Sequence, residues 1–215
     1  SVAVVTGANT GLGYETAKAL ASHGAHVVIA SRNADKAEAA KHKLLARVPD
    51  ASLEVITVDL ADLATIESFV DTFAERHNRL DLLINNAGIM MVPKGKTVDG
   101  FERQFGTNHL GHFALTGRLF ELLASTDRAR VVTVSSLAHR SGSIDFDDLM
   151  SDRGYRPQAA YCRSKLANLL FAFELQRRCE AAELDVISVA AHPGVSSTEL
   201  GDHLLANIFM QPLKL

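Results

Sequence analysis

The 215-residue sequence has no tryptophan, only five prolines and only two cysteines. Cys162 and Cys179 fall within one segment of helical periodicity, so we expect no disulfide scaffold and a reducing, cytoplasmic compartment. No apolar run approaches the 18 residues of a membrane span, and no secretory signal is visible. Because Ser1 directly precedes the first predicted strand, the possibility of an upstream leader or anchor stays open.

Neither sign of charge dominates, since 22 Lys and Arg residues face 25 Asp and Glu residues for a net charge of −3. The chain therefore lacks the basic excess that recruits nucleic acid or an anionic membrane surface. With 47% apolar and 22% charged residues, the composition is that of a globular protein and argues against disorder. No linker or repeat divides the chain, so we expect one domain over residues 1–215.

Short apolar segments alternate with longer helical patterns along the chain. The predicted strands cover residues 2–6, 26–30, 53–58, 81–84, 130–136 and 184–191. The predicted helices cover residues 12–23, 34–48, 63–77, 101–123 and 160–181. This alternation indicates βαβ units and a parallel sheet. Right-handed crossovers favour an α/β, Rossmann-type doubly wound sheet of order 3-2-1-4-5-6, with helices on both faces.

A glycine-rich segment, TGANTGLG at residues 6–13, joins the first predicted strand to the first predicted helix. Gly7 permits a tight turn, Gly11 lets the backbone approach a diphosphate, and Gly13 lets the helix pack closely on the sheet. The free N–H groups and the dipole at the start of the helix favour phosphate. The spacing differs from the general GxGxxG fingerprint, so a purely structural turn is the alternative.

The end of the second predicted strand bears on the choice of cofactor. No carboxylate stands at Ala30, Ser31 or Arg32 to accept from the ribose 2′-hydroxyl of NAD. The Arg32 guanidinium can instead pair with a 2′-phosphate, which favours NADP over NAD, although a solvated arginine is the alternative. Asp59 is predicted either to accept from an adenine amino group or to cap the following helix.

Tyr161 and Lys165 are four residues apart in a predicted helix and so share one face. A phenol with a pKa near ~10 is a poor acid or base at neutral pH, but a nearby ammonium lowers that pKa. Alone, such a pair is more often an ordinary surface pair. Ser136 ends the fifth predicted strand, at the sheet edge where doubly wound folds bind ligands. Asn108 lies within a predicted helix, where its amide either faces solvent, bonds to nearby backbone or holds a water.

Eight segments together resemble the short-chain dehydrogenase/reductase superfamily and, within it, the retinol dehydrogenase-like reductases. They occur in the expected order and span nearly the whole chain: TGANTGLG (6–13), ASRN (30–33), DLADL (59–63), NNAG (85–88), DGFERQFGTNHLGHFALT (99–116), VSSLAH (134–139), AYCRSKLANLLFAFEL (160–175) and HPGVSSTEL (192–200).

The resemblance implies roles for single residues. Tyr161 would be the general acid in reduction and the base in oxidation, and Lys165 would hold the nicotinamide ribose and lower the Tyr161 pKa. Ser136 would bind the substrate oxygen, and Asn108 would position a water and a helix kink. The implied cofactor-binding residues are Gly7, Asn9, Thr10, Gly11, Leu12, Gly13, Ser31, Arg32, Asn33, Asp59, Leu60, Asn85, Ala87, Gly88, Tyr161, Lys165, Pro193, Gly194, Val195, Ser196 and Thr198.

The expected function is an NADP(H)-dependent oxidoreductase that interconverts a carbonyl compound and an alcohol. The resemblance alone implies an apolar aldehyde or ketone, a homodimer or homotetramer formed through the helix at 160–181, and a chain shortened at both ends, without a seventh strand and lid. The alternatives are a nucleotide-sensing Rossmann protein without turnover, a light-dependent ring reductase, and an epimerase or dehydratase.

Two other kinds of chemistry are weaker candidates. His109 and His112 are three residues apart and could share a helix face, but no HExxH motif or carboxylate partner accompanies them, so we expect no metal. His139 follows the serines of the fifth strand, but the GxSxG elbow of a serine hydrolase is missing.

Overall fold

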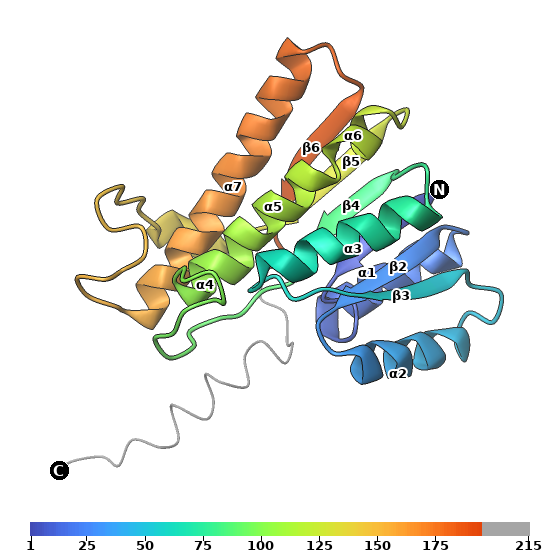
Figure 1. Cartoon of the computed structure of the whole chain (residues 1–215), viewed down its shortest axis with the longest axis horizontal. Helices are drawn as coiled ribbons and strands as arrows, with labels where there is room; N and C mark the ends of the chain where they lie inside the picture. The colour runs from blue at the N-terminus through green and yellow to red at the C-terminus, as the bar shows by residue number, and fades with distance from the viewer. Residues whose placement is uncertain (195–215) are drawn as a thin grey trace.

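A six-stranded parallel sheet of order β3-β2-β1-β4-β5-β6 forms the centre of the computed structural model, which describes residues 1–194 (Figure 1). This order is the predicted one. The strands are β1 (Val2–Thr6), β2 (His26–Ser31), β3 (Leu53–Thr57), β4 (Leu82–Asn85), β5 (Ala129–Val134) and β6 (Val186–Ala191).

Helices cover both faces of the sheet, so the Rossmann-type prediction is confirmed (Figure 1). Within residues 1–194, no helix has the length and apolar character needed to cross a membrane. The helical elements are α1 (Gly11–Ser22), α2 (Ala34–Leu45), α3 (Leu63–Arg76), α4 (Arg103–Phe105), the π-helix η1 (Gly106–Leu110), α5 (Gly111–Arg118), α6 (Phe120–Ala124), the 3-10 helix η2 (Leu137–Ser141) and α7 (Pro157–Ala181).

The strands β1 and β2 are buried on both sides, which is why they lack a polar face. In β1, Val4 packs in the cluster that also holds Phe69 of α3 and Leu115 of α5. Its neighbour Val5 packs in the opposite cluster, with Ala17 of α1 and residues of α2. Successive side chains of a strand point to opposite faces, so one strand contributes residues to the hydrophobic clusters on both sides of the sheet.

Two helices begin at side-chain caps of the expected type. Asn33 accepts a hydrogen bond from the Lys36 N–H at 2.8 Å at the start of α2. The α3 cap is Asp62, whose carboxylate accepts from the Ala64 N–H at 3.0 Å. Asp59 instead binds the Ala61 N–H at 2.9 Å, so the alternative in which Asp59 caps this helix is wrong.

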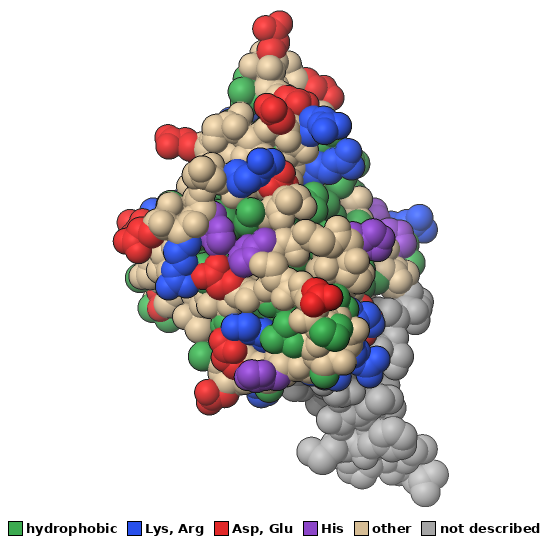
Figure 2. Space-filling view, turned by 90° about the vertical axis from the view of Figure 1, so that its right-hand side faces the viewer, with side chains coloured by type: hydrophobic (Ala, Val, Ile, Leu, Met, Phe, Trp, Pro, Cys, Tyr) green, Lys and Arg blue, Asp and Glu red, His purple; other side chains and the backbone are tan. Residues whose placement is uncertain are grey.

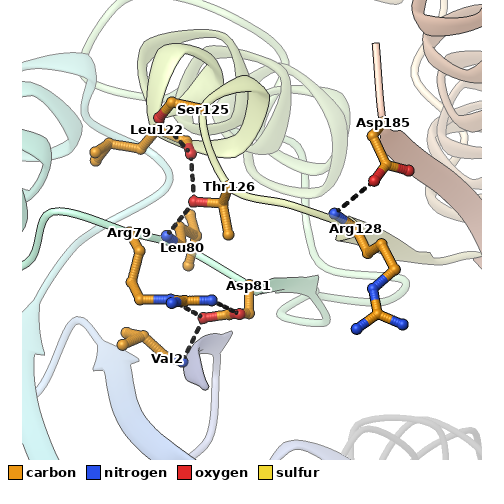
Figure 3. Close-up of polar contacts among 9 residues, drawn as sticks. All are labelled: Val2, Arg79, Leu80, Asp81, Leu122, Ser125, Thr126, Arg128 and Asp185. Carbon is orange, nitrogen blue, oxygen red and sulfur yellow. Dashed lines mark hydrogen bonds and ion pairs between the residues drawn. The ribbon is translucent and has the colours of Figure 1, made fainter.

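Side chains bind backbone groups at the edge where the strands begin (Figure 3). Asp81 accepts from the Val2 N–H at 2.8 Å and pairs with Arg79 through two hydrogen bonds. Thr126, just before β5, accepts from the Leu80 N–H at 3.1 Å. These contacts satisfy backbone donors that the strands leave unpaired at this edge.

The predicted helix at 101–123 is wrong as a single element, because the structure divides it into α4, η1, α5 and α6. Gly106 begins the wide turn of η1 and Gly111 directly follows it, and both allow close neighbours. A Cβ on Gly106 would lie 2.4 Å from the Thr97 side chain, and one on Gly111 would lie 2.3 Å from the Leu60 carbonyl oxygen. Side-chain periodicity does not report such a local change in helical pitch.

Candidate active site

A cavity of about 690 Å³ opens at the carboxyl ends of the central strands. This is the place where doubly wound folds bind ligands. The structure brings most of the predicted site residues to its wall: Gly7, Asn9, Thr10, Gly11, Leu12, Gly13, Ser31, Arg32, Asn33, Asp59, Leu60, Ala87, Gly88, Ser136, Tyr161, Lys165, Pro193 and Gly194.

Some predicted residues are placed elsewhere. Asn85 is fully buried behind the wall, where its amide donates to the Thr116 hydroxyl at 2.9 Å. The next residue, Asn86, lines the cavity instead, and its amide donates to the Thr6 carbonyl at 2.7 Å. Sequence reasoning missed Asn86 because the NNAG segment holds two adjacent asparagines. Three further predicted residues lie outside the described part of the chain: Val195, Ser196 and Thr198.

The glycine turn has the geometry of an anion cradle. Gly7 and Gly11 have positive φ angles of 66° and 54°, which side chains disfavour. Among the described residues, Thr10 makes no side-chain cap at the start of α1, and no acidic residue occupies the first turn. The N–H groups and positive dipole end of this 12-residue helix therefore face the cavity without a protein anion, and the turn fits a phosphate.

Gly13 is required where α1 meets the turn. A Cβ there would lie 2.4 Å from the Gly7 carbonyl oxygen and 2.5 Å from the Asn86 amide nitrogen. We expect Gly13→Ala to displace the turn and weaken nucleotide binding at least tenfold, with a loss of stability of about 1–3 kcal/mol. Gly117→Ala is the matched glycine control for binding, because its Cβ would meet nothing within 4 Å and its φ is not positive. Fluorescence titration with NADPH measures both, and equal affinity in the two variants would contradict this account of the turn.

Tyr161 lies in the second turn of α7 and is buried at the cavity wall. Burial raises the pKa of the phenol, and a hydrogen bond with Ser136 opposes this effect without cancelling it. The lowering of this pKa by Lys165, which the resemblance implied, stays a prediction. Desolvation is the stronger influence, and it keeps the hydroxyl protonated at neutral pH.

Lys165 lies one turn further along α7 and is also buried. Its ammonium donates to the Val134 carbonyl at 3.1 Å and lies 5.8 Å from the centre of the Tyr161 ring. Burial lowers the pKa of Lys165 to about 8. A Cβ on Gly88 would lie only 3.4 Å from the ammonium, so the loop after β4 fits closely around it.

The two serines that end β5 are distinguished by their partners. Ser135 donates its hydroxyl hydrogen to the Lys165 carbonyl at 2.7 Å, so this hydroxyl has no hydrogen left to donate to a ligand. Ser136 accepts from the Ala138 N–H at 3.2 Å, which leaves its hydroxyl hydrogen for the Tyr161 oxygen or for a ligand. The geometry therefore favours Ser136, beside Tyr161, as the hydroxyl that contacts a ligand in the cavity.

Asn108 lies in the π-helix η1 and clamps the loop after β4. Its side-chain oxygen accepts from the Ile89 N–H at 2.8 Å. Its amide donates to the Ile89 carbonyl and to the Ser164 hydroxyl, each at 2.9 Å. Asn108 is fully buried and does not face solvent, so it links η1, this loop and α7. Its role in holding a water stays a prediction.

His112 is a supporting residue that sequence reasoning missed. Its Nδ1 lies 2.9 Å from the Asn108 carbonyl oxygen, and its Nε2 lies 2.9 Å from the Thr6 hydroxyl. Burial lowers the pKa of this imidazole to about 4. His112 therefore joins the end of β1 to η1 as a neutral ring. The available signal was its position one helical turn after Asn108.

Residues 1–208 match the family model for short chain dehydrogenases. The chain belongs to this family. Human retinol dehydrogenase 12 is 48% identical over 202 residues, which cover 94% of this chain and 63% of that protein. Human polyprenol dehydrogenase is 44% identical over 207 residues, which cover 94% of this chain and 63% of that protein. The chain thus spans less than two thirds of the length of these curated relatives.

Two solved structures are also similar to this chain. A protein from Mycobacterium paratuberculosis is 48% identical with a TM-score of 0.81, over 99% of this chain and 77% of that one. The 3-oxoacyl-[acyl-carrier protein] reductase of Brucella melitensis, solved in complex with NAD, is 25% identical with a TM-score of 0.75. That match covers 96% of this chain and 78% of that reductase.

Proposed function

We propose that the chain is an NADP(H)-dependent oxidoreductase that transfers hydride between the nicotinamide and a carbonyl or alcohol substrate of apolar character. The observation that carries this proposal is the shared cavity, whose wall holds the glycine turn together with Ser136, Tyr161 and Lys165. Retinol and polyprenol dehydrogenases among the relatives support an apolar alcohol or its carbonyl form as substrate.

Each polar group at the inner end of the cavity has a distinct part in this reaction. A nicotinamide held in this cavity would supply or accept the hydride. In the reducing direction, the protonated Tyr161 hydroxyl donates its proton to the carbonyl oxygen, while Ser136 donates a hydrogen bond to the same oxygen. The Lys165 ammonium stabilises the phenolate that this leaves. Asn108 and His112 hold the surrounding backbone, so the donors need little reorganisation.

Arg32 is the residue proposed to select NADP. It is exposed at the wall of the cavity after β2, and Lys36 lines the wall nearby. Arg32→Ala is expected to weaken NADPH binding about 10- to 100-fold, since hydrogen bonds to charged groups contribute about 1.5–3 kcal/mol. NADH, which lacks the 2′-phosphate, should lose far less affinity. Calorimetric titration of both nucleotides measures the difference, and equal losses would remove the 2′-phosphate from the proposal.

Turnover separates the enzyme from a protein that only senses nucleotides. The test follows NADPH oxidation by absorbance against a panel of apolar aldehydes and ketones. The proposed oxidoreductase consumes NADPH with at least one of them. Tight NADPH binding without turnover of any member would instead favour the nucleotide-sensing alternative.

The organisation of the chain is part of the same proposal. We propose that residues 1–215 act as one dinucleotide-binding domain in the cytoplasm, since Cys162 and Cys179 are both free and buried. We further propose a homodimer or homotetramer. Leu170 and Phe173 of α7 are 49% and 61% exposed, and burying them against a second copy would remove apolar surface from water.

A further inference from the structure

Histidine side chains gather beside charged ones on the face where the strands begin, away from the cavity (Figure 2). Three of the residues there come from different elements. His26 begins β2, Glu54 lies in β3, and His77 directly follows α3. One ligand atom from each lies within 4.8 Å of the other two. We infer that His26, Glu54 and His77 form a binding site for a zinc-like divalent cation.

The spacing of the three ligand atoms suits tetrahedral coordination. The Glu54 Oε2 atom lies 2.8 Å from His77 Nε2 and 3.5 Å from His26 Nε2. Zinc bonds to imidazole nitrogen and carboxylate oxygen are about 2.0–2.2 Å, so ligands at a tetrahedral angle are about 3.3–3.5 Å apart. Small rotamer adjustments therefore bring all three atoms onto one ion, and the fourth position stays open to water.

The His26 ring presents Nε2 to the Glu54 carboxylate and Nδ1 to the Ser52 hydroxyl. Among the described residues, its Nε2 atom is buried and has no hydrogen-bond partner. Its Nδ1 atom lies 2.7 Å from the Ser52 hydroxyl, which accepts a proton from Nδ1 in one tautomer of the ring and donates to Nδ1 in the other. In the tautomer with a proton on Nδ1, the Nε2 lone pair faces the Glu54 carboxylate and is available to a cation. Metal-binding histidines typically donate their second ring N–H in this way.

The other two ligands are also held in place and suitably charged. The His77 ring lies 4.7 Å from the Phe73 ring and 5.1 Å from the His26 ring, measured between centroids. The Glu54 carboxylate forms an ion pair with Arg76. Arg76 bonds to Oε1, which leaves Oε2 for the metal.

The ligand set also indicates the class of ion. Imidazole nitrogen with one carboxylate suits zinc and its neighbours cobalt, nickel and copper, whereas magnesium and calcium prefer oxygen alone. The side chains of His26, Glu54 and His77 are 27%, 19% and 14% exposed, so an ion can enter from solvent. An ion bound there would link β2, β3 and α3 and stabilise this edge of the sheet.

Metal titration of the chelator-treated chain tests the site. We expect one equivalent of Zn²⁺ to bind by calorimetry, and Co²⁺ to give the visible absorption of a tetrahedral centre. Zn²⁺ should raise the midpoint of thermal unfolding, and Mg²⁺ should not. His26→Gln and His77→Gln should each weaken Zn²⁺ binding at least tenfold. His42→Gln, at an exposed histidine of α2, is the matched control and should bind as the unsubstituted chain does.

Other results overturn the inference. It is wrong if the unsubstituted chain binds no Zn²⁺, or if both variants keep its affinity, which would place the ion elsewhere. NADPH binding is measured in parallel and should be unchanged in both variants, because the cavity lies at the opposite edge of the sheet. If a variant does not fold, the unsubstituted chain still decides: equal thermal shifts with Zn²⁺ and Mg²⁺ would exclude this site.

Discussion

Tyr161→Phe is expected to lower the rate of carbonyl reduction by about 10²- to 10⁴-fold, the usual contribution of a positioned general acid. The substitution removes the proton donor at the cavity wall and keeps the buried ring, so the fold and NADPH affinity should change little. Steady-state rates with NADPH and a reactive aldehyde measure the effect. The loss should appear in kcat, because proton donation belongs to the chemical step.

Tyr14→Phe provides the matched control for this substitution. Tyr14 is a buried tyrosine of α1, and its hydroxyl has no hydrogen-bond partner among the described residues. Removing that hydroxyl should leave both stability and rate close to those of the unsubstituted chain. If Tyr161→Phe kept more than a tenth of the rate, or if both variants lost it equally, Tyr161 would not be the proton donor.

Acid should destabilise the chain by about 3 kcal/mol between pH 7 and pH 4 through His112 alone. The pKa of this imidazole is 6.5 in the unfolded chain and about 4 in the fully buried site. Between these values the unfolded state binds more protons, so native stability is present above pH 6.5 and is lost as pH falls toward 4. Each unit of pKa shift corresponds to about 1.4 kcal/mol.

His112→Gln isolates this contribution from other acid-sensitive groups. Glu54 and Asp81, whose pKa values are lowered, also lose stabilising interactions in acid, but they do so in both proteins. Urea unfolding of the unsubstituted chain and of the variant, at pH 7 and at pH 4, gives the unfolding free energy that each protein loses between the two pH values. The variant should lose about 3 kcal/mol less than the unsubstituted chain. Equal losses would show that His112 is not held neutral by burial.

The fold was predictable because its main signals are local. Residues 3–5 of β1 and 27–30 of β2 are all apolar since both faces of these strands are covered. The handedness of crossovers then leaves few sheet orders. The division of residues 101–123 was not predictable in this way. It depends on Gly111 lying against Leu60 and on Asn108 binding Ile89, which are contacts distant in sequence.

The candidate site was predictable where a motif fixes spacing. Tyr161 and Lys165 share a helix face because they are one turn apart, and the glycine turn follows a strand. The environment of the site was not predictable. The raised Tyr161 pKa reflects burial by several elements, and the cluster of His26, Glu54 and His77 forms only when β2, β3 and α3 pack together. Residues this far apart in the sequence show no common pattern from which their contact could be predicted.

Isotope transfer tests the central claim, that hydride passes directly between a nicotinamide in the cavity and the substrate carbon beside Tyr161. The chain is incubated with NADPH deuterated at both C4 positions and an aldehyde that it reduces, and the alcohol is analysed by mass spectrometry. The account predicts deuterium on the former carbonyl carbon of the alcohol. An alcohol without deuterium, or NADPH bound with no alcohol formed from any aldehyde of the panel, would contradict it.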